Sequence, residues 1–208
     1  MVSHTLPALA AVAVASVATS GLGRVLRPVS TGLRIRDERP RDIAAREALL
    51  DRSFGPARFT KTSERLREGR LPAQGLSFVA LDGAALVGTL RFWDVEAGRH
   101  ASLLLGPLAV EETHRSAGIG RALIEHGLRR ARKLGHGSVI LVGDAPYYAR
   151  FGFAAAPVAK LTLPGPVDPA RFLGLELVPG GLAEASGRVV GAGLLVKRRG
   201  PESLRLAA

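Results

Sequence analysis

Residues 103–153 read LLLGPLAVEETHRSAGIGRALIEHGLRRARKLGHGSVILVGDAPYYARFGF, and they combine a buried-strand pattern, a glycine-rich turn, an amphipathic helix and a second turn rich in aromatic residues. The segment opens with three leucines and continues through Gly106-Pro107 into Leu108, Ala109 and Val110. Proline has no N–H to donate to a sheet, so this apolar strand has to bend at Pro107. We therefore expect a kinked central strand, with the other elements arranged around it.

A glycine-rich loop, RSAGIG at residues 115–120, follows this strand and opens a helix that runs through Lys133. The helix is predicted from apolar residues that recur at helical spacing: Ile124, Leu128, Ala131 and Leu134. The free N–H groups of its first turn and its positive dipole end would meet where Gly118 and Gly120 let a ligand approach the backbone. A diphosphate fits such a site, although two glycines alone also suit a tight turn without a ligand.

Two motifs in this region resemble those of the GNAT superfamily of N-acetyltransferases. Arg115, Gly118 and Gly120 match motif A, Arg/Gln-x-x-Gly-x-Gly/Ala, and Tyr148 stands four residues before Gly152-Phe153, as in motif B. The strand LLLGPLAV, the double tyrosine and LELVPG at residues 175–180 also resemble the branch of predicted acetyltransferases labelled YhbS-like. The resemblance covers about residues 33–193, and two motifs in the right order are more specific than either alone.

The resemblance implies an α/β fold, with a mixed, mostly antiparallel central sheet that splays at the acetyl-CoA site and is flanked by helices. It implies direct transfer of an acetyl group from acetyl-CoA to a primary amine of a small molecule or protein. The pyrophosphate would be held by backbone N–H groups of the loop and the helix start, and the pantetheine by the strand. The first set comprises Arg115, Ser116, Ala117, Gly118, Ile119, Gly120 and Arg121, and the second Leu108, Ala109 and Val110.

For catalysis, the resemblance places Tyr148 as the acid that protonates the departing thiolate, with Tyr147 as the alternative. A phenol of ordinary pKa, about 10, would set the alkaline limb of the rate profile. No single base can be named from four residues near the strand end: Glu111, Glu112, Asp94 and His114. In this fold the segment 54–71 walls the acceptor cleft, which makes four of its residues acceptor-site candidates: Arg58, Phe59, Lys61 and Arg65.

Composition excludes several other kinds of site. The chain of 208 residues is 47% hydrophobic and 23% charged, which suits one sizeable globular domain. It has no cysteine, and its five histidines lack metal-ligand spacing, so we expect no metal. The net charge of +11 attracts polyanions in general, but dispersed basic residues and 5% aromatics do not favour a nucleic-acid-binding protein. A non-catalytic CoA-binding sensor and a basic RNA- or membrane-associated protein remain the alternatives.

The chain divides by composition into an extension at residues 1–32, a GNAT domain at 33–196 and a basic, mobile tail at 197–208. The extension carries no charge between Leu6 and Gly23 and then has Arg24 and Arg27, which leaves a targeting segment or a disordered extension open. We expect a cytoplasmic monomer or homodimer, with an organellar or membrane-associated protein as the alternative.

The remaining elements follow from local patterns. Residues 33–36 alternate like a strand, and a helix is predicted from Pro40 to Ser53 with an apolar side at Ile43, Leu50 and Phe54. A hairpin at Asp82-Gly83 is expected to join strands at 76–81 and 85–96. Strands at 159–163 and 172–178 are expected to complete the sheet.

Overall fold

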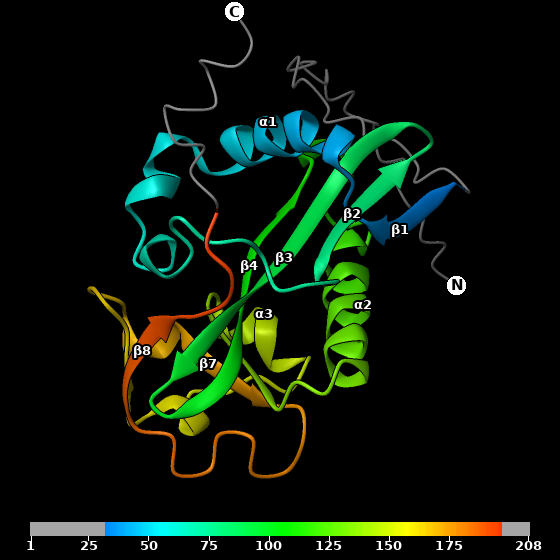
Figure 1. Cartoon of the computed structure of the whole chain (residues 1–208). Helices are drawn as coiled ribbons and strands as arrows, with labels where there is room; N and C mark the ends of the chain where they lie inside the picture. The colour runs from blue at the N-terminus through cyan, green and yellow to red at the C-terminus, as the bar shows by residue number, and fades with distance from the viewer. Residues whose placement is uncertain (1–31, 197–208) are drawn as a thin grey trace, which may run out of the picture.

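The computed structural model describes residues 32–196, so the extension and the basic tail predicted above lie outside the described residues, apart from Gly32. Six strands follow one another across the main sheet in the order β1-β2-β3-β4-β5-β7, and helices cover both faces (Figure 1). These strands are β1 (Leu33–Asp37), β2 (Ser77–Asp82), β3 (Ala85–Ala97), β4 (His100–Val110), β5 (Ser138–Val142) and β7 (Phe172–Glu176). Among neighbours in this six-strand order, only the β4–β5 pair is parallel. The predicted fold class, an open and mostly antiparallel sheet flanked by helices, is confirmed.

Alternation along β3 divides the core between the two faces of the sheet. Leu90 and Phe92 pack with helix α2 (Ile119–Lys133) in one hydrophobic cluster, whereas Trp93 and Val95 belong to a second cluster on the opposite face. Helix α1 (Ile43–Phe54) lies over the second face near β4, through Leu49 and Leu50. A short 3-10 turn, Pro40–Asp42, leads directly into α1. The strand pattern thus sets which helix covers which face.

Three local predictions are wrong in detail. Ile43 and Leu134 were expected on apolar helix sides, but they are 47% and 45% exposed, and Leu49 and Leu123 are buried in α1 and α2 instead. The predicted strand at 159–163 shortens to β6 (Leu161–Thr162). It pairs with the unpredicted strand β8 (Gly187–Gly191), which in turn pairs with β3 at residues 95–97, beyond the end of its pairing with β2.

The remaining helical segments are short. Helix α3 (Ala145–Ala149) follows β5, and five further 3-10 turns are Pro56–Thr60, Glu64–Leu66, Glu112–His114, Ala156–Val158 and Pro169–Arg171. The turn at Glu64–Leu66 lies in the segment 54–71, which was expected to wall the acceptor cleft. No helix within residues 32–196 is long and apolar enough to cross a membrane.

Close contact between α2 and β3 depends on Gly127, which makes Gly127→Ala a test of the packing. A Cβ added there would lie 2.5 Å from Cε2 and 2.7 Å from Cζ of Phe92, a fully buried ring. Alanine favours a helix by about 1 kcal/mol over glycine, but overpacking costs about 1–3 kcal/mol. We expect urea denaturation to show a net loss of about 1 kcal/mol in the free energy of unfolding. Exposed Arg129→Ala on the same helix is the control, and an equally stable Gly127→Ala protein would contradict the close contact.

Candidate active site

The sheet opens between β4 and β5. The two strands pair only at Leu103 with Val139 and at Leu104 with Ile140. Beyond Leu104, β4 bulges, so that Arg91 of β3 faces both Gly106 and Pro107, and the indole Nε1 of Trp93 donates to the Gly106 carbonyl at 2.7 Å. Within residues 32–196, the β5-facing edge of residues 105–110 pairs with no strand. This edge keeps backbone groups available for an extended ligand.

The glycine-rich loop reaches the same opening from the other side. Residues 115–118 are exposed, Ser116 and Gly118 have φ values of 69° and 79°, and the left-handed Gly118 is the N-cap residue of α2. First-turn N–H groups of a helix have no acceptor inside the helix. They border a groove of about 190 Å³ that is lined by Ser53, Phe54, Leu108, Ala109, Val110, Arg115, Gly120 and Tyr147. The loop and residues 108–110 of β4, predicted separately as ligand-binding segments, therefore line one groove.

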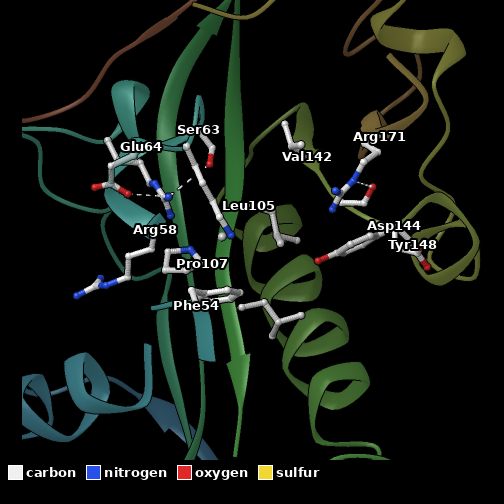
Figure 2. A pocket seen from close by; sticks show the side chains of 15 residues that line it. Phe54, Arg58, Ser63, Glu64, Leu105, Pro107, Val142, Asp144, Tyr148 and Arg171 are labelled. Atoms are coloured by element: carbon white, nitrogen blue, oxygen red, sulfur yellow. Dashed lines mark hydrogen bonds and ion pairs between the residues drawn. The ribbon is translucent and has the colours of Figure 1, made fainter. Parts of the chain in front are cut away.

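A larger cavity of about 320 Å³ continues from this groove past the β4 bulge. Figure 2 shows Arg58, Ser63 and Glu64 on one wall and Tyr148, Asp144 and Arg171 on the opposite wall, with Pro107 between them. The other lining residues are Phe54, Lys61, Arg67, Leu105, Gly106, Leu108, Val142 and Gly143. Phe54 and Leu108 line both spaces, so the cavity and the groove adjoin.

The tyrosine pair is divided between these two spaces. The Asp144 carboxylate accepts a hydrogen bond from the Tyr147 N–H at 3.2 Å and so caps α3. Tyr147 lines the groove, whereas Tyr148 reaches into the cavity (Figure 2). Gly143 makes room for it, because a Cβ there would lie 2.2 Å from Cε2 of Tyr148.

Burial also changes the chemistry of Tyr148. Desolvation, helped by Tyr147 and the Asp144 carboxylate, raises the pKa of Tyr148 to about 12. The phenol therefore keeps its proton throughout the neutral range and well above it. The value of about 10 expected for an ordinary phenol is thus too low for this site.

The acceptor-site candidates from segment 54–71 separate in the structure. Arg58 and Lys61 line the cavity, Arg65 lines an adjoining hollow with Lys61 and Arg171, and Phe59 lines neither and is 58% exposed. The Arg58 guanidinium lies 4.1 Å from the centre of the Phe59 ring.

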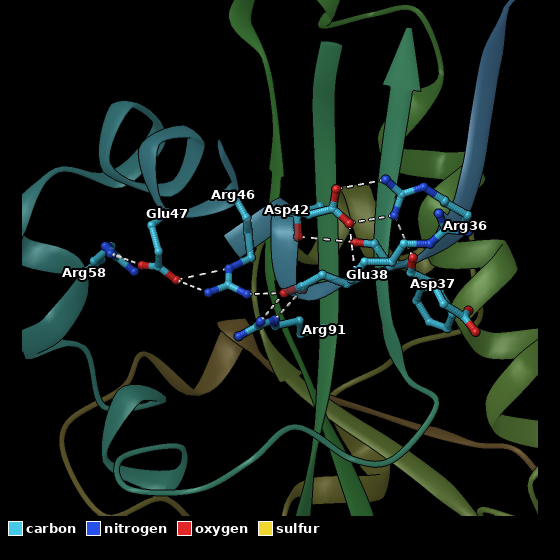
Figure 3. Close-up of polar contacts among 11 residues, drawn as sticks. Arg36, Asp37, Glu38, Asp42, Arg46, Glu47, Arg58 and Arg91 are labelled. Carbon is cyan, nitrogen blue, oxygen red and sulfur yellow. Dashed lines mark hydrogen bonds and ion pairs between the residues drawn. The ribbon is translucent and has the colours of Figure 1, made fainter. Parts of the chain in front are cut away.

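A run of ion pairs holds Arg58 at the cavity wall (Figure 3). Glu47 of α1 accepts from both Arg58 and Arg46, and Glu38 accepts from Arg46 and Arg91. A separate pair joins Arg36 to Asp42, and the hydrogen bond from Arg36 holds the pKa of Asp42 at about 2. The network ties α1 to β3 and thereby fixes one wall of the cavity.

None of the four predicted base candidates lines the cavity or the groove. Glu111 pairs with Arg52, His114 Nε2 lies 3.3 Å from Asp82, and Asp94 lies beside Gly193. The carboxylates in the cavity are Glu64 and Asp144 instead, and its further basic residues are Arg67 and Arg171. Sequence reasoning did not single out Glu64, Arg67 or Arg171 for the site, because each belongs to a polar segment without a motif. No group of three or more His, Cys, Asp or Glu in residues 32–196 could hold a metal.

A sheet that splays beside a glycine-rich helix start, with a cavity at the bulge, is the arrangement that the resemblance to N-acetyltransferases implies. The family model described as "Acetyltransferase (GNAT) domain" matches residues 73–155. The "Uncharacterized N-acetyltransferase YhbS" of Escherichia coli K12 is 36% identical over 125 residues, which cover 59% of this chain and 74% of that protein. The chain belongs to the GNAT acetyltransferase family.

Two solved structures are similar to the chain over nearly their whole length. The crystal structure of Escherichia coli YhbS in complex with CoA has a TM-score of 0.66 and 31% identity, and covers 79% of this chain and 96% of its own. A GNAT family acetyltransferase from Brucella melitensis in complex with acetyl-CoA has a TM-score of 0.59 and 29% identity, with 77% and 96% covered. Both share the overall fold described above.

Proposed function

We propose that this protein transfers an acetyl group from acetyl-CoA to the primary amine of an acceptor that lies in the cavity at the β4 bulge. The observation that carries the proposal is the continuity of the groove at the α2 N-terminus with the cavity that contains Tyr148. The CoA and acetyl-CoA complexes of the two similar structures support the choice of co-substrate.

The groove offers backbone partners for two parts of acetyl-CoA. Gly118 and Gly120 leave the first-turn N–H groups of α2 approachable, and a helix N-terminus favours a diphosphate. We assign the diphosphate to the backbone from Arg115 to Arg121 and the pantetheine amides to the unpaired edge at residues 108–110. The N–H groups of that edge would then polarise the thioester carbonyl. Acetyl-CoA supplies the acetyl group as a thioester.

The transfer makes one bond and breaks one. The neutral amine nitrogen attacks the carbonyl carbon, the C–N bond forms, the C–S bond breaks, and the nitrogen loses one proton to solvent. We assign Tyr148 as the donor of a proton to the departing sulfur, because its phenol reaches the cavity and its raised pKa keeps it protonated. Solvent then returns the proton to the phenol.

Calorimetry with acetyl-CoA, followed by an acceptor screen read by free-thiol release, tests this function. We expect binding together with thiol release in the presence of a suitable amine. Binding without transfer to any amine would favour a CoA-binding sensor. Polyanion binding that collapses with salt and survives disruption of Gly118 and Gly120 would favour an RNA- or membrane-associated protein.

We further propose that residues 33–196 are the catalytic domain and that it works in the cytoplasm as a monomer or homodimer. A chain that starts at Thr31 is expected to keep its acetyl-CoA affinity, because β1 begins at Leu33 and pairs with β2 along its whole length. The matched control starts at Glu38 and lacks β1, so its free energy of unfolding should fall. Loss of binding in the longer truncated chain would instead show that residues 1–30 support the domain.

A further inference from the structure

Basic side chains dominate the acceptor cavity. Arg58, Lys61, Arg67 and Arg171 line it, against the carboxylates of Glu64 and Asp144. The adjoining hollow adds Arg65 and Asp168. An amine arrives at neutral pH mainly as an ammonium ion, and this wall would repel a ligand that carried only positive charge.

Arg67 is the most buried of these cations, with 8% of its surface exposed. Its Nη2 lies 2.8 Å from Glu64 Oε2 and donates to Ser63 Oγ at 3.4 Å, while its Nε is buried without a hydrogen-bond partner among the described residues. Arginine is rarely buried unless all its donors are used. Its Nε is covered by protein, so Arg67 acts on a ligand in the cavity through the positive charge of its guanidinium, which favours an anion there.

The other cations differ in how far they are already compensated. Arg58 is neutralised by Glu47 and Asp51, at 2.5 and 2.9 Å. Within residues 32–196, Lys61 and Arg171 pair with no carboxylate. Lys61 Nζ lies 4.6 Å from the centre of the Phe54 ring, and Arg171 Nε donates to the Gly143 carbonyl at 3.4 Å. Lys61 and Arg171 lie far apart in the chain, and each contributes uncompensated positive charge to the cavity.

We propose that the acceptor is a primary amine that also carries an anionic group, a carboxylate or a phosphate, which Lys61, Arg67 and Arg171 bind. This inference rests on the proposed acetyl transfer. The positive charges of these three side chains attract the anionic group. The same charges favour the neutral form of the amine, which is the form that attacks. The cavity thereby selects against polyamines and assists deprotonation without a dedicated carboxylate base.

Matched pairs of amines test this inference with the full-length protein. γ-Aminobutyrate is compared with its primary amide, and O-phosphoethanolamine with ethanolamine, in the thiol-release assay. We expect kcat/KM to be at least about 10-fold higher for the anionic member of one pair, and the pair that shows it tells carboxylate from phosphate. Spermidine should be a poor acceptor.

Lys61→Gln and Arg171→Gln then locate the anion site, since both side chains are exposed and neither change disturbs the core. Each is expected to lower kcat/KM for the preferred anionic amine by about 10-fold, mainly through KM, and to lower kcat/KM for the neutral partner much less. Lys160→Gln removes the same charge outside the cavity and is the control.

Two results would overturn the inference while acetyl transfer stands: neutral amines acetylated as efficiently as anionic ones, or a preference for anionic amines that persists unchanged in both variants. A protein that binds acetyl-CoA and acetylates no amine in the screen would instead contradict the proposed function itself.

Discussion

Tyr148→Phe is expected to lower kcat by about 100- to 10,000-fold, the usual cost of removing a general acid. The substitution keeps the ring, which packs beside Gly143 and contacts Phe153 edge-on with a centroid distance of 5.8 Å, so the loss reports on the hydroxyl alone. Calorimetric affinity for acetyl-CoA should change little, because Tyr148 lines the cavity and not the groove.

The dependence of the rate on pH tests the role of Tyr148 as proton donor. Donation requires the protonated phenol, so activity should persist as pH rises and fall only through the raised pKa of about 12. A loss of rate centred near pH 10, the pKa of an unperturbed phenol, would contradict the assignment of the buried Tyr148 as the proton donor. In Tyr148→Phe, this limb should be absent.

Tyr147→Phe is the matched control for the adjacent ring. Its hydroxyl faces the groove at the start of α2, 2.9 Å from the place that a Cβ on Gly120 would take. We expect kcat to stay near that of the unmodified protein. If Tyr147→Phe were inactive and Tyr148→Phe fully active, the roles of the two rings would be exchanged, and if both were active, the thiolate would leave without help from either.

Gly120→Glu is expected to weaken acetyl-CoA binding by about 30-fold or more. The new side chain would displace the Tyr147 hydroxyl and place a negative charge where the diphosphate binds, two effects of roughly 1–3 and 1–2 kcal/mol. A tenfold change in affinity corresponds to about 1.4 kcal/mol. The fold should survive, because an acidic residue in the first turn suits the helix dipole.

Gly120→Gln separates the two contributions, since it has a similar size without the charge. We expect an affinity between those of the unmodified protein and Gly120→Glu, measured by calorimetry at constant salt. Unchanged affinity in a folded Gly120→Glu protein would remove the loop from the binding site.

Much of the fold follows from local sequence patterns. The period of two along β3 assigns Phe92 and Trp93 to opposite faces, and Asp82-Gly83 places the hairpin, because each depends on neighbours in the chain. The bend at Pro107 and the helix start at Gly118 are likewise consequences of one residue's backbone chemistry. Two motifs in the right order, Arg115-x-x-Gly118-x-Gly120 and Tyr148 ahead of Gly152-Phe153, indicated the family.

The exposure of side chains at helix ends could not be predicted from local sequence patterns. Ile43 and Leu134 satisfy the apolar period, yet each lies at or beyond a helix end, where no element within residues 32–196 covers it fully. The strand β8 was missed because it lacks an apolar pattern: Val189 is the one buried residue among its five. Its pairing also depends on the edge of β3 that β2 leaves free, which is a tertiary feature.

For the candidate site too, some properties follow from the sequence and others from the tertiary structure. The sequence alone determined the loop, the strand and the tyrosine pair, since motif residues lie close together in the chain. Tertiary structure alone decided that Tyr148 faces the cavity with a pKa of about 12, and that Glu64, Arg67 and Arg171 meet there while Glu111 and His114 do not. Burial and electrostatic fields depend on distances in space between segments far apart in the chain, and local patterns do not contain those distances.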